Sequence, residues 1–192
     1  AKTLVDAGFL EMELVSFISP KWIPQMADAA EVVKELVSYR RKTGAKTMFI
    51  GLAPNPKGID NAMKTEIDAI VCPISVSERH NKSNVNRTRE ESFKELEEAM
   101  ARHEGINVTV GLATAFGSPY PGEKILTEDI IRMAERAFDI GAKKVVLADT
   151  VGNGDPLHID QVLTEVKKYI DLDRCSFHLH DTMGLALANT LV

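Results

Sequence analysis

Cysteine is scarce in this sequence, and its placement excludes two classes of small cross-linked protein. Only Cys72 and Cys175 are present, far apart and each inside an apolar, strand-like run. A disulfide framework needs more cysteines, and a zinc ribbon needs them in closely spaced pairs. The sequence therefore predicts neither kind of cross-link and favours a reducing compartment, the cytoplasm.

Long apolar runs and a strong charge of one sign are also missing. No apolar segment approaches the roughly 20 residues that span a bilayer, and the first residues show no charged-then-apolar signal pattern. The formal net charge is −5, and no cluster of lysine and arginine suggests binding to nucleic acid or to a membrane surface. We therefore expect a small-molecule partner, with no nucleic acid and no membrane.

Both ends of the sequence look interrupted. Residues 1–8 have the pattern of the last turns of a helix that ends at Gly8, and residues 185–192 begin an apolar helical pattern that stops without a cap. The chain of 192 residues is 44% hydrophobic and 27% charged, which is enough for a substantial core. We expect one globular catalytic domain over residues 1–192, truncated at both ends.

Short β-type runs alternate along the chain with longer helical patterns, which predicts a parallel sheet with right-handed crossovers. No glycine-rich phosphate turn follows any strand, and this weakens the alternative of an open doubly wound sheet. Polar residues recur at strand ends, as in the rim of a (β/α)8 TIM barrel. The prediction is an α/β fold, a (β/α)8 barrel fragment with about six strand–helix units. The strands are expected near 10–15, 47–52, 69–74, 106–113, 144–148 and 174–179, and the helices near 28–43, 57–65, 89–103, 127–140 and 157–170.

The most informative motif is the pair His178 and His180, at the end of the last expected strand. Residues two apart on a strand point the same way, so both imidazoles should face one cavity. Two convergent histidines next to a carboxylate, Asp181, suit a divalent metal. The alternative is a pair of hydrogen-bonded interior histidines, since two ligands do not complete a coordination sphere.

Two carboxylates at strand ends are further candidates for the site. Glu13 lies near the rim of the first expected strand, on the same face as the solvated Glu11, and its alternative role is a structural ion pair. Asp149 ends a strand and enters the flexible turn Thr150-Val-Gly-Asn-Gly154, where an Asx-turn or a helix cap is the alternative. The rim position of both residues favours a functional role.

The polar stretch Ser77–Arg89 follows a strand end and is rich in cations. It predicts a long loop, which could hold an anionic substrate or could simply be solvated. Thr88 with Glu91 has the spacing of a capping box for the helix that follows. The clearest helix lies at 127–140, with Thr127 as the expected N-cap and Gly141 as the stop.

Three segments together resemble the hydroxymethylglutaryl-coenzyme A lyase family. They are Ser16-Phe-Ile-Ser-Pro-Lys-Trp-Ile-Pro-Gln-Met-Ala-Asp28, Asp149-Thr-Val-Gly152, and His178-Leu-His-Asp-Thr-Met-Gly184 through Ala188-Asn189. The first segment is rather specific to that family. The His-x-His motif is shared more widely among metal-dependent lyases and Claisen-type synthases with the same barrel.

The resemblance implies a lyase that cleaves 3-hydroxy-3-methylglutaryl-coenzyme A into acetoacetate and acetyl-coenzyme A with a divalent cation, magnesium or manganese. His178 and His180 would be metal ligands, with His178 also catalytic. Glu13 would organise the substrate pocket, and Asp149 would contribute to the polar site. The partner would be an acyl-coenzyme A substrate, and leucine breakdown and ketone-body formation would both be compatible. The sequence leaves open whether the chain associates with copies of itself.

The family's remaining machinery is expected outside this sequence, so neither cysteine is assigned a catalytic role. Ser118 stands where the family commonly has cysteine, and the 77–86 stretch lacks an aromatic residue often found there. One rival is a condensing synthase of the isopropylmalate or homocitrate type, against which Asp181 argues. A second rival is a truncated chain without catalytic activity that only binds metal or a partner subunit.

Overall fold

The computed structural model describes residues 1–192 and contains six strands, with at least one helix between each strand and the next. The strands follow one another in the order β1-β2-β3-β4-β5-β6. A doubly wound sheet would reverse its order at a switch point, whereas a (β/α)8 barrel keeps the order of the chain. The prediction of an α/β fold with six units of such a barrel is therefore confirmed. The strands are β1 (Glu11–Ser16), β2 (Met48–Leu52), β3 (Ala69–Ser75), β4 (Val108–Ala113), β5 (Lys144–Asp149) and β6 (Cys175–Leu179).

The five helices predicted between the strands are all present, with ends that differ by a few residues, and one further helix, Glu78–Val85, was not predicted. Two short helices, α1 and α8, lie where the two ends of the sequence predicted helical turns. No helix in the chain combines the length and the apolar character needed to cross a membrane. The helices are α1 (Lys2–Asp6), α2 (Ala29–Thr43), α3 (Pro56–Ala62), α4 (Glu78–Val85), α5 (Arg89–Arg102), α6 (Thr127–Asp139), α7 (Pro156–Val166) and α8 (Ala186–Asn189), with 3-10 turns η1 (Pro24–Met26) and η2 (Leu172–Arg174).

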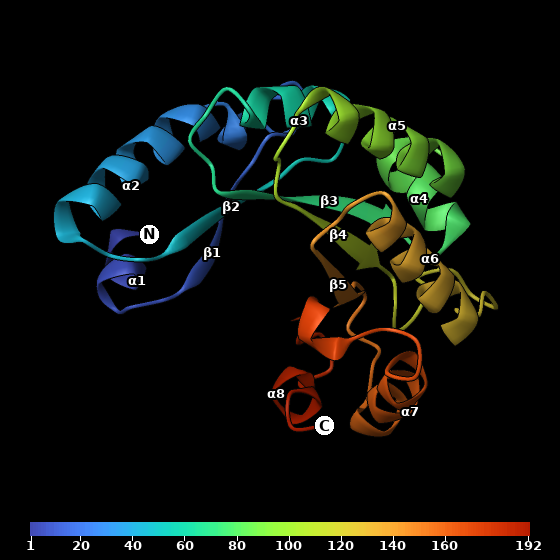
Figure 1. Cartoon of the computed structure of the whole chain (residues 1–192). Helices are drawn as coiled ribbons and strands as arrows, with labels where there is room; N and C mark the ends of the chain where they lie inside the picture. Colours follow the sequence, from blue (N-terminus) through green and yellow to red (C-terminus); the bar gives the residue numbers. More distant parts are fainter. The chain divides into compact units, whose positions relative to one another are not determined.

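One compact unit comprises residues 1–72 and 95–108. In it, β1 pairs in parallel with β2, and β2 pairs in parallel with β3. The pairing of β1 skips Leu14, because Glu13 lies opposite Ile50 and Val15 opposite Gly51. Helix α2 packs on β1, and α1 packs on α2 (Figure 1). The core of this unit includes the fully buried side chains Val33, Val37, Phe49, Ile59 and Ile70.

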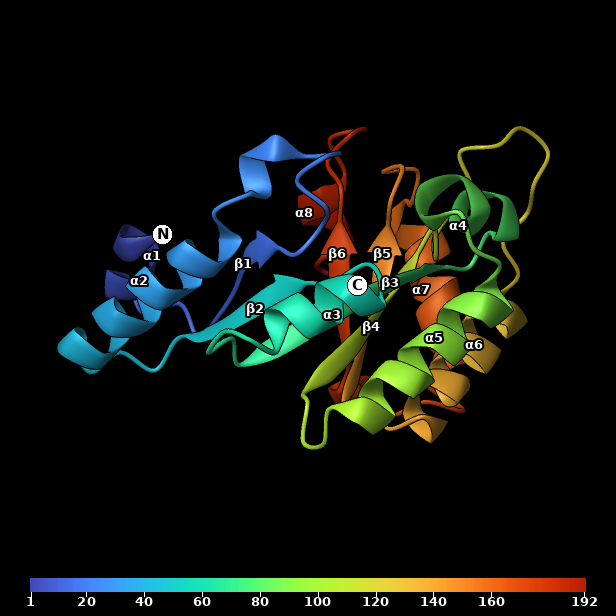
Figure 2. The ribbon, with the colours of Figure 1, turned by 90° about the horizontal axis from the view of Figure 1, so that it is seen from above.

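The second compact unit comprises residues 73–94 and 109–192. Here β4 pairs in parallel with β5, and β5 with β6, so that Ala148 lies opposite His178. Helix α6 packs on β5 and on α7, and α7 contacts α8. Figure 2 shows α6 and α7 along the strands β4 and β5. The prediction of a single domain over residues 1–192 stays a prediction.

Helix α6 shows how closely the apolar pattern determined the fold. Ile130, Ala134 and Ala137 are buried, as their helical spacing predicted. The residue at the N-cap is Leu126, one position before the predicted Thr127, which is instead the first residue of the helix. Gly141 follows the last turn with a φ of 99°, a conformation that costs glycine little, and it ends the helix as predicted.

The predicted loop over Ser77–Arg89 was wrong, because most of it forms helix α4. The Ser77 side chain accepts a hydrogen bond from the backbone N–H of His80, which caps the start of the helix. Asn86 ends it in the left-handed conformation, with a φ of 55°. The predicted capping box at Thr88 and Glu91 is confirmed by reciprocal hydrogen bonds at 2.7 and 3.1 Å.

Candidate metal and active site

His178 and His180 point toward each other, as their spacing on a strand predicted. His178 lies in β6, and His180 directly follows its last residue. Their Nε2 atoms are 3.1 Å apart, and the two rings are nearly perpendicular, at 81°. Both side chains are exposed. The pair therefore presents two ring nitrogens to one point at the end of β6.

The orientation of His180 is fixed by a backbone group from the neighbouring strand end. Its Nδ1 lies 2.7 Å from the carbonyl oxygen of Thr150, in the loop after β5. Because a carbonyl only accepts, Nδ1 carries the proton and Nε2 keeps its lone pair when the ring is neutral. Metal-binding histidines commonly donate their second ring nitrogen to such a carbonyl.

The distance between the two Nε2 atoms fits joint binding of one cation. Two ligands at about 2.1 Å from a cation and at right angles to each other are about 3.0 Å apart. The observed separation of 3.1 Å is close to this value. No cluster of three or more His, Cys, Asp and Glu side chains that could hold a metal is present in residues 1–192. The pair thus fits two of the positions around a cation.

Asp149 is fully buried at the end of β5, and its carboxylate is bonded to the loop that follows. One oxygen, Oδ1, accepts from the N–H of Asn153 at 3.1 Å, and Oδ2 accepts from the N–H of Gly154 at 3.0 Å. These bonds are those of the local turn that the sequence left open as an alternative. Asn189 adds a bond from its Nδ2 to the carbonyl of Gly154, at 2.8 Å. Asp149 therefore closes the loop that carries the Thr150 carbonyl.

Gly152 lets this loop approach the residues that follow the histidine pair. Its φ is +69°, and a Cβ at this position would lie 2.4 Å from Thr182 Oγ1. Any larger residue would face both a strained backbone and a collision. The two loops after β5 and β6 are therefore in direct contact because position 152 is glycine.

Thr114, directly after β4, has an unusual backbone conformation that the sequence did not reveal. Its φ is 61°, and its side chain is fully buried. The left-handed conformation costs a non-glycine residue about 1–2 kcal/mol, and a β-branched side chain is rarely found there. Three hydrogen bonds offset this strain. Thr114 Oγ1 donates to the Ala113 carbonyl at 2.6 Å and accepts from the Ser77 N–H at 3.0 Å, and the Thr114 N–H donates to Thr150 Oγ1 at 2.7 Å.

Glu123 organises the polar residues at the ends of β3 and β4. Its Oε2 accepts from Ser77 Oγ at 2.7 Å and also from the hydroxyl of Ser118. Nearby, the guanidinium of Arg79 lies over the ring of Tyr120, 4.1 Å from its centre. In Figure 2 the loop between β4 and α6 lies beside α4. These contacts hold that loop against the start of α4.

His80 belongs to the same group of residues. Its Nδ1 lies 2.7 Å from the hydroxyl of Ser75, a buried residue at the end of β3. Burial lowers the pKa of His80 below its ordinary value of 6.5, and the negative charge of Glu123 partly opposes this shift. The unfolded chain keeps the ordinary pKa and binds more protons below it. The contribution of His80 to the free energy of unfolding is therefore fully present above about pH 6.5, and it is lost as the pH falls from there toward the lowered pKa.

We expect Glu123→Gln to lower the pKa of His80 further, because the variant removes the negative charge that raises it. The titration of the His80 Cε1 proton, followed by NMR, measures this shift. Glu128→Gln is the matched control, because Glu128 lies in the first turn of α6 and is absent from the causes of the His80 shift. An unchanged or raised midpoint in Glu123→Gln would contradict the electrostatic contact.

The two cysteines have no features of a catalytic thiol. Burial raises the pKa of Cys72 to about 12, and burial followed by the charge of Asp171 raises the pKa of Cys175 to about 11. A nucleophilic cysteine needs a lowered pKa, since the thiolate is the reactive form. Both thiols are free. The structure thus offers no reason to assign either cysteine a role in the reaction.

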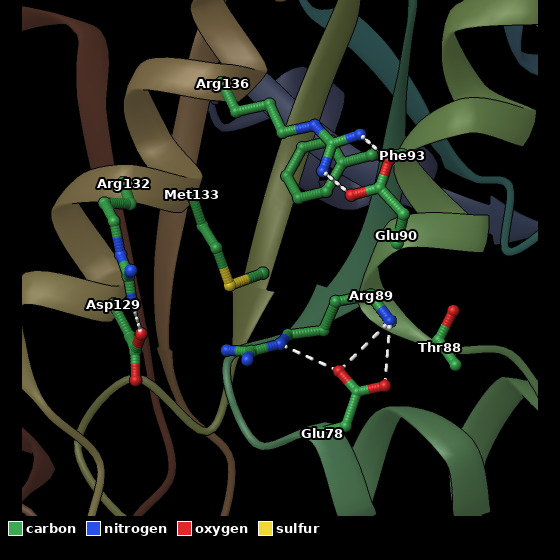
Figure 3. Close-up of a pocket in the computed structure, with 9 residues that line it drawn as sticks. All are labelled: Glu78, Thr88, Arg89, Glu90, Phe93, Asp129, Arg132, Met133 and Arg136. Atoms are coloured by element: carbon green, nitrogen blue, oxygen red, sulfur yellow. Dashed lines mark hydrogen bonds and ion pairs between the residues drawn. The ribbon is translucent and has the colours of Figure 1, made fainter.

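A separate pocket of about 300 Å³ lies between the helices α5 and α6 (Figure 3). Its three arginines are all paired with carboxylates. Arg89 Nε lies 2.8 Å from Glu78, Arg136 binds Glu90 at 2.5 and 2.7 Å while lying over Phe93, and Arg132 pairs with Asp129. The positive charge of Arg89, within the stretch that could have held an anion, is thus balanced by Glu78.

The predicted site residues fall into the two compact units. His178, His180 and the loop closed by Asp149 lie together in the second unit. Glu13 lies exposed on β1 in the first unit, and its role stays a prediction. Sequence reasoning missed the roles of Thr114, Thr150 and Glu123, because these roles come from hydrogen bonds between the ends of different strands and the loops that follow them. The only local signal was their position after β4 and β5.

A family model described as HMGL-like matches residues 1–192. The chain is 34% identical over 188 residues to the hydroxymethylglutaryl-CoA lyase of Bacillus subtilis, covering 97% of this chain and 61% of the relative. It is 35% identical over 191 residues to the mitochondrial hydroxymethylglutaryl-CoA lyase of Rattus norvegicus, covering 98% and 57%. The chain spans about three fifths of the length of these two relatives.

Solved structures of HMG-CoA lyases are also similar to this chain. The crystal structure of the Bacillus subtilis HMG-CoA lyase has a TM-score of 0.88 at 31% identity, covering 99% of this chain and 62% of that one. An HMG-CoA lyase from Acinetobacter baumannii, in complex with coenzyme A and 3-methylmalate, has a TM-score of 0.88 at 30% identity, covering 99% and 61%. The similarity extends over nearly all of the present chain.

Proposed function

Since the chain belongs to the HMGL-like family, we propose that the protein cleaves 3-hydroxy-3-methylglutaryl-coenzyme A into acetoacetate and acetyl-coenzyme A. The relatives described above are named as lyases of this substrate, which are carbon–carbon lyases. The reaction breaks one carbon–carbon bond. The tertiary hydroxyl loses its proton and becomes the ketone of acetoacetate, and the acetyl-coenzyme A fragment takes up a proton.

The observation that carries this proposal is the geometry of the histidine pair. The Nε2 atoms of His178 and His180 are 3.1 Å apart, and Thr150 holds His180 with its Nε2 lone pair facing His178. The two residues would hold a divalent cation, with oxygen ligands in the other positions if the ion is Mg²⁺ or Mn²⁺. A cation bound there supplies Lewis acidity to the oxygens of the substrate.

The other predicted residues would support the site in different ways. We propose that Glu13 helps to organise the substrate pocket, and its exposure on β1 leaves its carboxylate accessible. Asp149 would act through the loop after β5. Its carboxylate accepts hydrogen bonds from the N–H groups of Asn153 and Gly154 in that loop. This loop presents the Thr150 carbonyl to His180. His178 would combine metal binding with a place next to the reacting groups.

An acyl-coenzyme A substrate is supported by the Acinetobacter baumannii relative, whose structure contains coenzyme A and 3-methylmalate. Association with copies of the chain stays a prediction, as do leucine breakdown and ketone-body formation. We also propose a cytoplasmic location. The named relatives include a cytoplasmic as well as a mitochondrial lyase of Rattus norvegicus.

The direct test is turnover of the full-length protein. After removal of metal with EDTA, we expect no cleavage of 3-hydroxy-3-methylglutaryl-coenzyme A, and we expect acetoacetate to form when Mn²⁺ or Mg²⁺ is added back. Acetoacetate measured enzymatically gives the rate. Turnover that is unaffected by EDTA would contradict the role of the metal. Condensation of acetyl-coenzyme A with a 2-oxo acid, without lyase activity, would assign the protein to the synthases instead.

A further inference from the structure

A series of hydrogen bonds connects the ends of four strands in the second compact unit and ends at His180. The Ser77 N–H, after β3, donates to Thr114 Oγ1, after β4, at 3.0 Å. The Thr114 N–H donates to Thr150 Oγ1, after β5, at 2.7 Å. The Thr150 carbonyl accepts from His180 Nδ1, after β6, at 2.7 Å. Each bond joins one strand end to the next.

We propose that Thr114 is a positioning residue that sets the orientation and tautomer of the His180 imidazole through Thr150. Thr114 does not contact either histidine in this series, and it acts only on the residue that binds His180. The inference rests on the proposed function in one respect, because the purpose of the orientation is to present His180 Nε2 to a cation.

The hydroxyl of Thr114 holds the turn after β4 in the conformation in which the Thr114 N–H bonds to Thr150. With a φ of 61°, the N–H of this buried residue bonds to a side chain. The two bonds of the hydroxyl, to the Ala113 carbonyl and from the Ser77 N–H, hold the residue in that conformation against its strain. Without the hydroxyl, the strain of a β-branched residue is no longer offset by these two bonds. Because the Ala115 N–H holds the next residue to the Ala148 carbonyl, a return to a negative φ would shift the peptide group between residues 113 and 114, whose N–H bonds to Thr150.

Loss of this contact would reach the metal ligand. Thr150 would lose the bond that fixes its side chain, and its carbonyl would be kept in line with His180 Nδ1 less tightly, by the bonds of Asp149 to the loop alone. A neutral imidazole without a fixed acceptor at Nδ1 also populates the tautomer with the proton on Nε2. That tautomer has no lone pair at Nε2 to give to a cation.

The test uses full-length protein with two substitutions at position 114. Thr114→Val keeps the side-chain shape but removes the hydroxyl, and Thr114→Gly removes the hydroxyl but adopts a positive φ without strain. We expect Thr114→Val to weaken Mn²⁺ affinity by about 10–100-fold, the usual effect of losing an outer partner of a metal ligand. We expect Thr114→Gly to stay close to the wild-type affinity. Isothermal titration with Mn²⁺ measures both.

The tautomer gives a second readout that needs neither metal nor substrate. In ¹⁵N spectra of the metal-free protein, His180 should carry its proton on Nδ1 in the wild type and in Thr114→Gly, and should show a mixture of tautomers in Thr114→Val. Thr47→Val is the matched control, because Thr47 is another buried threonine, whose hydroxyl bonds to the Phe9 carbonyl at 2.7 Å. It should leave His180 unchanged.

An unchanged tautomer and Mn²⁺ affinity in Thr114→Val would overturn the proposal, as would equal losses in Thr114→Val and Thr114→Gly. If Thr114→Val does not fold, Thr150→Val provides the same test, because it removes the Oγ1 that accepts from the Thr114 N–H. The proposed lyase activity is tested separately. If the tautomer depends on Thr114 while no acetoacetate forms, only the proposed function is wrong.

Discussion

Replacing His180 with alanine is expected to weaken Mn²⁺ binding and to lower turnover by about 100-fold or more, above the roughly 10–100-fold effect of losing an outer partner of a ligand. The variant removes one of the two Nε2 atoms that lie 3.1 Å apart. It also removes the donor to the Thr150 carbonyl. A site with a single imidazole would lose one of its nitrogen ligands and, with it, the arrangement of two ligands around the cation. Calorimetric titration with Mn²⁺ and the acetoacetate assay measure the two effects.

His103→Gln is the matched control for this experiment. His103 is a histidine of the first compact unit, and its Nε2 lies 2.8 Å from the carboxylate of Asp60. Its replacement should leave Mn²⁺ affinity and turnover near the wild-type values. If His180→Ala binds Mn²⁺ as tightly as the wild type, the histidine pair would be only a hydrogen-bonded structural pair, the alternative that the sequence left open.

Replacing Asp149 with alanine is expected to destabilise the full-length protein by about 2–4 kcal/mol. The carboxylate accepts from the N–H groups of Asn153 and Gly154, and a buried donor left without a partner costs about 1–3 kcal/mol. The loop would loosen at the same time, and the Thr150 carbonyl with it. We therefore expect weaker Mn²⁺ binding as well. Urea denaturation gives the free energy of unfolding, and titration gives the affinity.

Asp155→Ala is the matched control, because it removes another aspartate of the same loop without removing the two bonds that Asp149 makes to Asn153 and Gly154. Asp155 is exposed and caps α7 by accepting from the His158 N–H at 2.8 Å. Losing such a cap typically costs about 1 kcal/mol, and Mn²⁺ affinity should not change. If Asp149→Ala is no more destabilising than Asp155→Ala, the two bonds to the loop do not contribute as their geometry indicates.

The sequence predicted the histidine pair because its geometry is local. Alternate residues of any strand face the same side, so His178 and His180 had to converge once β6 was recognised. The fold was predictable for a similar reason. Helix α6 follows from the spacing of Ile130, Ala134 and Ala137, and the six alternating units follow from the repetition of such patterns. Each of these inferences needs only residues close together in the chain.

The sequence did not reveal two features, one hidden by local composition and one that depends on partners from distant segments. Helix α4 was missed because its polar composition hid the caps Ser77 and Asn86, which stand at its two ends. The conformation of Thr114 runs against the preference of a β-branched residue and exists only because Ser77 and Thr150 bond to it. For Asp149, a local turn and a functional role were alternatives; the structure shows the bonds of the turn, and the functional role stays a prediction.

The series of bonds from Ser77 to His180 has a consequence for the order in which the protein folds. Its first and last residues are about a hundred positions apart in the sequence, and each bond requires the next strand to have joined the sheet. Contacts between distant segments form late, because the loops between them must close first. His180 is therefore fully held in its orientation only when the ends of β3, β4, β5 and β6 lie together in the sheet. Affinity for a divalent ion would then be a property of the assembled sheet and not of the segment that carries the two histidines.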